Sequence, residues 1–279
     1  MTHRRFSVLH AAFTLALTLA LAGCGTLRTL PLVGPALVPA WDDATLSSNW
    51  RGANAIDRIM NLLSPYFSAA KRREYIAWAK ARGCNTIHLI LSNRADGEGG
   101  GYSIWGTNPA ARQVDQAWVK QARATIAECR SAGMAVVLWG MTDDDGGWNR
   151  TILADPARYM RDLADAGLLS YCSTFVLGLE MTEWGATTAQ IVAYRDAVRS
   201  VFPGKIGTHH NSERVDYAHL GDVLMYQTSP GKSAAQIAAL TRKALATGKP
   251  VNFFELERHE NRALSQAALD AGAYGVGNW

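Results

Sequence analysis

The sequence has little charge and no strong excess of either sign. Only 19% of its 279 residues are charged, and the formal net charge is +4. A balance this close to neutral gives no argument for nucleic acid as a partner, and the only basic triplet, 71–73, is explained by a solvated helix face. The hydrophobic share of 48% excludes a wholly disordered chain. The length suits one large α/β domain or two small ones.

Several catalytic and ligand-binding motifs are absent. There is no Gly-x-Ser-x-Gly nucleophile elbow, and neither 51–55 nor the glycine-rich stretch 97–101 forms a phosphate loop between a strand and a helix. The acidic run 143–145 lacks the spacing of a calcium loop. His209 and His210 are adjacent, so on a strand they point to opposite faces, which weakens a metal site. We therefore expect no metal and no cofactor.

The N-terminus has the pattern of an export signal. Arg4 and Arg5 precede an apolar run, 6–22, that is short for a membrane span of about 20 residues. The run ends in Leu-Ala-Gly before Cys24, which resembles the lipobox of bacterial lipoproteins. That resemblance implies cleavage before Cys24, lipid on its sulfur, and a membrane anchor in the cell envelope, facing the periplasm or at the outer membrane. We expect three segments, a signal peptide, a lipidated and proline-containing tether, and a folded domain: 1–23, 24–44 and 45–279.

Three cysteines remain after Cys24, and an odd number in an exported protein leaves at least one free thiol. Cys84 and Cys172 each precede a predicted strand, and Cys129 lies near a predicted helix end. All three are expected on the N-terminal side of the sheet. A structural role, with one disulfide as an option, is therefore favoured over a nucleophile.

The rest of the chain alternates short apolar runs with helical stretches. The runs are rich in Val, Ile and Leu without polar alternation, as buried parallel strands require. Helix starts are indicated at Asp155-Pro156, Thr188 and Ser233. Eight strands and seven helices predict a single (β/α)8 barrel whose last helix is missing, with a doubly wound open sheet as the alternative. The predicted strands are 49–56, 85–92, 134–141, 174–181, 205–210, 222–227, 250–256 and 274–278.

Carboxylates follow two of these strands at the end of the barrel where chemistry is expected. Glu180 and Glu183 come after the fourth strand, and Glu255 comes at the end of the seventh. These strands face each other across a barrel of eight, so a pair can flank one bond, as glycoside cleavage requires. Flat aromatic side chains, which stack on sugar rings, also follow strands: Trp105, Trp148, Trp184 and Trp279.

Three segments are similar to one enzyme family. Residues 76–87, residues 133–139 with the later 147–149, and Lys249-Pro250 with Glu255 resemble clan A glycoside hydrolases, the cellulase-like family 5 group. The resemblance implies a glycoside hydrolase barrel with Glu255 as the nucleophile. It also implies residues that position the sugar, for which we take Asn54, His209, Tyr226 and Trp279.

The acid/base is one of two glutamates. Aligning Thr182-Glu183-Trp184 with the Asn-Glu motif of the family makes it Glu183, which we take as the first candidate. Strand length points instead to Glu180, which ends the apolar run. The chain departs from the family pattern at His88, where an arginine is usual, and at strand six, where only Tyr226 of a His-x-Tyr motif is kept.

The expected protein is a lipid-anchored monomer that cleaves a poly- or oligosaccharide by a retaining mechanism with two carboxylates. The carboxyl groups of such a pair lie about 5–5.5 Å apart, whereas those of an inverting pair, the other mechanism left open, lie roughly 6.5–9.5 Å apart. The alternative is a barrel that binds a saccharide at the envelope without cutting it. A metal-dependent hydrolase is the third hypothesis.

Overall fold

The computed structural model describes residues 55–278, apart from 82, 95–99, 144–146, 211–212 and 256–261. For residues 55–60, 255, 262 and 278 it describes the backbone alone. The signal peptide and the tether, with Cys24, therefore lie outside the described residues, as do Asn54 and Trp279. The predictions made for them stay predictions.

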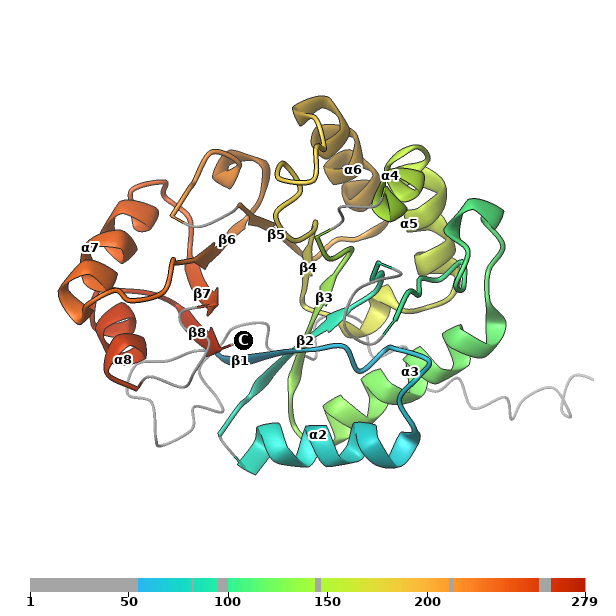
Figure 1. Ribbon diagram of the computed structural model, residues 1–279, viewed down its shortest axis with the longest axis horizontal. Coiled ribbons are helices and arrows are strands. Elements are labelled where there is room, and N and C mark those ends of the chain that lie inside the picture. The colour runs from blue at the N-terminus through green and yellow to red at the C-terminus, as the bar shows by residue number, and fades with distance from the viewer. Residues whose placement is uncertain are drawn as a thin grey trace, which may run out of the picture. The chain divides into compact units, whose positions relative to one another are not determined.

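Eight parallel strands close into a barrel in chain order, and the last strand pairs with the first (Figure 1). Apolar runs that are covered on both faces form these strands, which is typical of parallel sheets. The predicted (β/α)8 fold is confirmed. The strands are β1 (Ala55–Met60), β2 (Thr86–Ile90), β3 (Ala135–Trp139), β4 (Thr174–Val176), β5 (Lys205–His209), β6 (Val223–Gln227), β7 (Val251–Glu255) and β8 (Gly275–Asn278).

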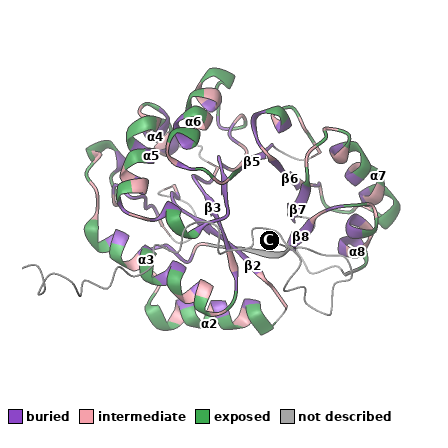
Figure 2. Cartoon of the chain, turned by 180° about the vertical axis from the view of Figure 1, so that it is seen from behind, coloured by how far each residue is buried: buried purple, intermediate pink, exposed green. Residues whose placement is uncertain are grey.

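Helices surround the barrel, and their exposed faces point outward, while the strand residues whose burial is described are mostly buried (Figure 2). They are α2 (Ala69–Ala81), α3 (Gln116–Ser131), α4 (Trp148–Leu153), α5 (Pro156–Asp165), α6 (Thr188–Val201), α7 (Ala234–Leu245) and α8 (Arg262–Asp270). Within the described ranges, none of these helices combines the length and apolarity needed to cross a membrane.

The helices are distributed less evenly than predicted. The connection from β3 to β4 contains both α4 and α5, whereas the described part of the connection from β5 to β6 contains only a 3₁₀ turn, Ala218–Leu220. The prediction of one helix between every pair of strands was therefore wrong at this point. Residues 210–222 are too few to leave the sheet, form a full helix and return.

Polar side chains cap the helix starts much as expected. Asp155 accepts the backbone N–H of Arg158, with Pro156 in the first turn. Ser233 forms a capping box with Gln236. In α6 the cap is Thr187, one residue before the predicted Thr188.

The first strand lies further along the chain than predicted. It runs over Ala55–Met60 rather than 49–56. The apolar pattern missed it because Asp57 and Arg58 interrupt the run. Asn54 consequently precedes this strand in the chain, whereas the prediction placed it near the C-terminal end of the first strand.

Side-chain alternation separates an inner from an outer face of the barrel. One buried cluster joins residues of β2, β3, β4, β6 and β7, which can meet only inside the barrel: Ile90, Val137, Trp139, Val176, Val223, Met225 and Phe254. Alternate residues of the same strands pack outward. Leu138 and Phe175 belong to the cluster formed with α2–α6, and Phe253 to the cluster formed with α7 and α8.

Candidate active site

A chain of hydrogen bonds links three strand ends on the inner face. His209 ends β5 and is 5% exposed. Its Nδ1 lies 3.1 Å from the backbone nitrogen of Glu180, and its Nε2 lies 3.1 Å from Oε1 of Gln227 in β6. Because a backbone N–H can only donate, Nδ1 is unprotonated, and Nε2 carries the proton that Gln227 accepts. Burial lowers the pKa of His209 to about 3, so the ring is neutral.

Two aromatic rings that also contact each other pack against His209. Its ring meets Phe254 edge-on at a centroid distance of 4.7 Å and Trp139 at 5.7 Å. Trp139 in turn donates its indole N–H to Nδ1 of the buried His88, at 2.8 Å. Residues of β2, β3, β5 and β7 therefore fix one another at this end of the barrel.

The two candidate acids after β4 lie in different surroundings. Glu180 is half-buried and has a left-handed backbone, with φ of 44°. Such a conformation costs an L-residue roughly 1–2 kcal/mol and is concentrated at functional sites. Glu183 is exposed, and its backbone N–H donates to the Glu180 carbonyl oxygen at 2.8 Å, which closes an ordinary turn.

Glu255 ends β7 on the same side of the barrel. Its backbone is the register partner of Gln227, after a shift in pairing between Tyr226 and Gln227. β5 and β6 separate β4 from β7 in the barrel. The hydrogen-bond chain from Glu180 through His209 to Gln227 thus spans the strands between the two glutamate-bearing ends. The side chain of Glu255 lies outside what the structure describes, and its role as nucleophile stays a prediction.

Tyr226 is placed differently from the prediction. It is buried on the outer face, where its ring meets Phe253 edge-on at 5.1 Å in the cluster with Ile237 of α7. Burial raises its pKa to about 12. A side chain between sheet and helix does not reach a sugar in the barrel mouth, so the predicted role does not fit. The next residue, Gln227, points inward instead, and the sequence reasoning missed it.

The predicted tryptophans also differ in how far their rings are buried. Trp184 is only 4% exposed and donates its indole N–H to the Leu179 carbonyl oxygen, at 3.0 Å. Trp105 is 2% exposed. Neither presents an open ring face, because both belong to the outer core. Trp148 is half-buried and donates to the Ser92 hydroxyl at 3.1 Å, which leaves part of its ring at the barrel mouth.

Tyr66 is an aromatic side chain at the mouth that the sequence reasoning did not select. It follows β1 in the chain and is 64% exposed. Its ring rests against Gly100, where an added Cβ would collide with it. Gly100 also accepts a hydrogen bond from the side chain of Asn93, at 3.1 Å, just beyond β2. No local sequence pattern marks Tyr66, because its exposure is set by the fold.

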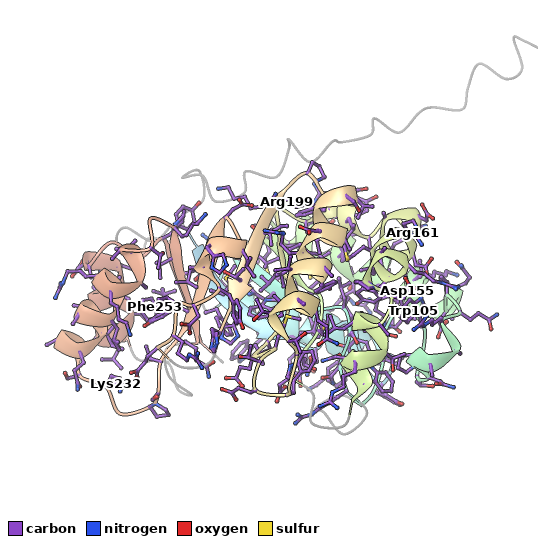
Figure 3. All side chains as sticks on the ribbon, turned by 90° about the horizontal axis from the view of Figure 1, so that it is seen from above. Trp105, Asp155, Arg161, Arg199, Lys232 and Phe253 are labelled. Carbon is purple, nitrogen blue, oxygen red and sulfur yellow. The ribbon has the colours of Figure 1, made fainter. Side chains whose placement is uncertain are left out.

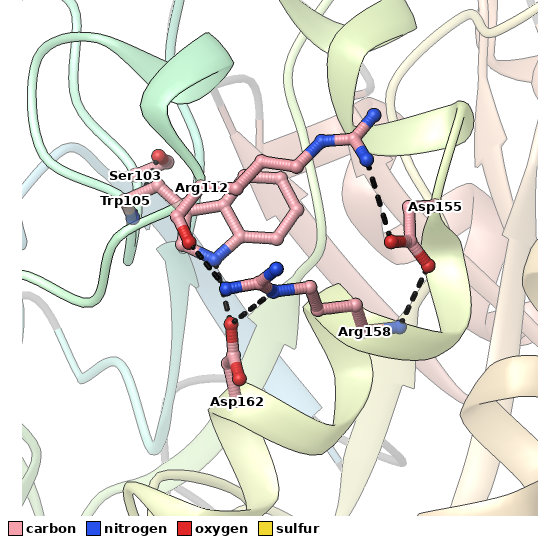
Figure 4. Close-up of polar contacts among 6 residues, drawn as sticks. All are labelled: Ser103, Trp105, Arg112, Asp155, Arg158 and Asp162. Atoms are coloured by element: carbon pink, nitrogen blue, oxygen red, sulfur yellow. Dashed lines mark hydrogen bonds and ion pairs between the residues drawn. The ribbon is translucent and has the colours of Figure 1, made fainter.

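Polar contacts fasten the long connection after β2 to α5 (Figure 4). Trp105 donates to Asp162 at 2.7 Å, and the guanidinium of Arg158 contacts both Asp162 and the Arg112 carbonyl oxygen. Arg112 pairs with Asp155 at 3.4 Å. Trp105 and Asp155 lie close together at one edge of the barrel, well away from Phe253 of β7 (Figure 3). One wall of the mouth is therefore tied to the helix layer.

His210 points away from His209, as expected for adjacent residues. Its Nε2 lies 3.2 Å from the Thr182 hydroxyl, and its ring stacks on Tyr217 at 5.2 Å. In the part of the chain that the structure describes, no group of three or more His, Cys, Asp or Glu side chains could hold a metal ion.

The three cysteines in the described part of the chain form no disulfide with one another. Cys129 and Cys172 are buried free thiols, so neither pairs with Cys84. Burial raises the pKa of Cys129 to about 12 and raises that of Cys172 as well. Such thiols are inert core residues, in line with the structural role favoured by the sequence.

No protein family and no curated protein matches this sequence. Solved structures of similar fold include several glycoside hydrolases. One is a family 5 glycoside hydrolase from Bacteroides vulgatus ATCC 8482, with a TM-score of 0.60 and 12% identity, covering 80% of this chain and 57% of that one. Another is an exo-β-1,4-mannosidase from Opitutaceae bacterium strain TAV5, with a TM-score of 0.61 and 15% identity, covering 85% of this chain and 55% of that one.

A third similar structure is the GH113 β-mannanase from Alicyclobacillus acidocaldarius in complex with ManMIm. Its TM-score is 0.54 at 13% identity, over 86% of this chain and 88% of that one. The chain spans little more than half the length of the two hydrolases named before it. At these identities the likeness shows a shared barrel fold. The expected resemblance to glycoside hydrolases is thus supported at the level of the fold.

Proposed function

We propose that this protein is a retaining glycoside hydrolase that acts on a β-linked poly- or oligosaccharide. The observation that carries the proposal is the arrangement of the β4 and β7 ends. Each bears a glutamate, and the chain through His209 and Gln227 connects the two ends across β5 and β6. Paired carboxylates at this end of a barrel are what glycoside cleavage needs.

The proposed reaction has two steps, formation of a glycosyl ester and its hydrolysis. The carboxylate of Glu255 attacks the anomeric carbon while a protonated glutamate after β4 gives its proton to the leaving oxygen, so the glycosidic bond breaks as a glycosyl ester forms. The same glutamate, now ionised, takes a proton from water, whose oxygen displaces Glu255 and releases the sugar. Trp148 and Tyr66 offer partly open rings for stacking at the mouth.

β-1,4-Mannosides are the first substrates to test, because two of the similar structures are a β-1,4-mannosidase and a β-mannanase. The experiment is release of reducing sugar by the purified mature chain on mannan, manno-oligosaccharides and a panel of envelope and plant polysaccharides. Release by the wild type, with loss of at least about 100-fold in Glu255→Gln, supports the hydrolase and its nucleophile. Equal release by the variant contradicts the assignment of Glu255.

A saccharide-binding barrel without catalysis is the second candidate. The outward placement of Tyr226 and the burial of Trp184 favour it, since both leave the mouth with fewer groups to hold a sugar. Measurable polysaccharide binding without release by the wild type would select this candidate.

The anchor is proposed from the sequence motif alone. Leu-Ala-Gly before Cys24 supports lipidation of that cysteine and attachment in the cell envelope. Cys24→Ser should move the protein from the membrane to the soluble fraction after cell lysis. Equal membrane association of the variant would contradict the anchor.

A further inference from the structure

We propose that His209 is a positioning residue that holds Glu180, rather than Glu183, as the acid/base of the barrel mouth. The inference rests on the proposed hydrolase function and goes beyond it in two ways. It decides between two glutamates that the sequence leaves open, and it gives His209 a role through the backbone of Glu180 instead of contact with the sugar.

The backbone of Glu180 adopts a conformation that has to be stabilised by its surroundings. Its left-handed φ of 44° needs local support, because an L-residue does not hold this conformation freely. The backbone N–H of Glu180 points to Nδ1 of His209, at 3.1 Å. A hydrogen bond to a buried acceptor offsets the conformational cost, since opening it would leave both groups unsatisfied. The backbone that carries the Glu180 side chain is thereby held in one conformation just beyond β4.

The hydrogen bonds of His209 fix which ring nitrogen carries the proton. Nδ1 accepts only if Nε2 carries the proton, and Gln227 selects this state by accepting the Nε2 proton through its own Oε1. The rings of Trp139 and Phe254 cover the imidazole. The neighbouring His210 contacts the Thr182 hydroxyl instead, at 3.2 Å. His209 is therefore built to stay neutral and fixed.

Glu183 differs from Glu180 in exposure and in its hydrogen bonding. Its side chain is exposed, and its amide donates to the Glu180 carbonyl oxygen within the turn. An acid catalyst needs a partly desolvated carboxyl that stays protonated before attack. Glu180 is half-buried whereas Glu183 is exposed, so the difference in burial favours Glu180.

The chain permits a matched pair of substitutions at one position. In His209→Asn the side-chain oxygen lies where Nδ1 lies, so the acceptor for Glu180 is kept. In His209→Gln the amide nitrogen lies near the place of Nε2, so the contact to Gln227 is kept and the acceptor for Glu180 is lost. His210→Gln is the control, because His210 contacts Thr182 and not the Glu180 amide.

The first measurement is amide hydrogen exchange at Glu180 in the full mature chain. We expect exchange at least about tenfold faster in His209→Gln, with little change in His209→Asn and His210→Gln. Unchanged exchange in His209→Gln, or an equal acceleration in His209→Asn, would overturn the positioning contact. This measurement does not depend on any enzymatic activity.

The second measurement separates the two glutamates by the leaving group of the substrate. Glu180→Gln should lose at least about 100-fold in kcat on an oligosaccharide but far less on an aryl glycoside whose leaving group needs no proton. His209→Gln should follow Glu180→Gln with a smaller loss in kcat and an unchanged KM. If Glu183→Gln shows the leaving-group dependence instead, Glu180 is not the acid/base. A wild type inactive on every substrate, with exchange as expected, would overturn the hydrolase function and with it the catalytic role of Glu180, while leaving the contact in place.

Discussion

The two faces of the barrel use polar side chains in different ways. On the outer face, Tyr159 donates its hydroxyl to the Gly140 carbonyl oxygen, at 3.0 Å, so a helix residue is tied to the backbone of the sheet. On the inner face, Trp139 and His88 bond each other through their side chains, at 2.8 Å. The outer contacts fasten layers together, whereas the inner contacts fix the relative positions of side chains from different strands.

This difference indicates where function lies. Buried polar side chains are costly unless every group is satisfied, and a barrel interior filled with aliphatic residues would be simpler to stabilise. The inner face nevertheless carries the buried His88 and His209, and the half-buried Gln227 at the end of β6. A network of this kind makes sense when it positions a group that acts on a ligand, and the half-buried Glu180 is at its end.

Substitution of Gly140, at the outer face, is expected to change the free energy of unfolding the most. A Cβ there would collide with the hydroxyl of Tyr194 in α6 and lie 2.7 Å from the Leu177 carbonyl oxygen. We expect Gly140→Ala to lower the free energy of unfolding by about 3 kcal/mol, measured by urea titration. The backbone atom cannot yield as a flexible side chain would.

Gly133 is the matched control for that substitution. It has a φ of 81°, and nothing lies within 4 Å of an added Cβ. Gly133→Ala should therefore cost only the left-handed strain, about 1 kcal/mol. If the two alanine variants lose equal stability, crowding at the outer face is not what constrains Gly140.

His209 provides the corresponding test of the inner face, through pH. Its pKa in the folded state, about 3, lies below the ordinary value near 6.5, so the unfolded chain takes up the proton first. Its contribution to stability is complete above about pH 6.5 and is lost as the pH falls toward 3, at up to about 1.4 kcal/mol per pH unit. Thermal unfolding between pH 6.5 and 4.5 should show this loss in the wild type and in His210→Gln, but not in His209→Gln. A wild-type slope retained in His209→Gln would assign the proton uptake to another group.

Much of the fold could be predicted from the sequence because local patterns encode it. Strands such as β3 and β6 are apolar runs, and caps such as Ser233 mark helix starts. β1 could not be found this way, since Asp57 and Arg58 lie within it. The missing helix between β5 and β6 follows from chain length rather than from any local breaker.

The candidate site was less predictable, for a physical reason. Strands covered on both faces lack the polar alternation that would show which residues face inward. Nothing local to Leu224-Met225-Tyr226 therefore distinguishes the outward Tyr226 from the inward Gln227. The contact between His209 and the Glu180 amide joins residues 29 positions apart, so it becomes visible only when the barrel closes.

Substitutions at Tyr226 and Gln227 test the difference between the two faces directly, because these residues are adjacent in one strand and face opposite ways. Gln227→Leu leaves the buried Nε2–H of His209 without its acceptor and should cost about 2 kcal/mol of unfolding free energy. The hydroxyl of Tyr226 has no hydrogen-bond partner among the described residues, so Tyr226→Phe should change stability by less than about 0.5 kcal/mol. Urea unfolding measures both. A larger cost for Tyr226→Phe would mean that the outer hydroxyl has a structural role that the inner network does not explain.

The smallest effect concerns the backbone of Glu180 alone. Glycine occupies the left-handed region without a Cβ penalty, so Glu180→Gly should be more stable than Glu180→Ala by about 1 kcal/mol, although glycine elsewhere destabilises. Glu183→Gly and Glu183→Ala are the matched pair, and there alanine should be equal or better, because Glu183 is not among the residues with positive φ. If alanine is the more stable choice at both positions, the left-handed conformation at Glu180 is not held in solution. In that case the inner network would have nothing strained to support, and the argument that singles out Glu180 would fail at its first step.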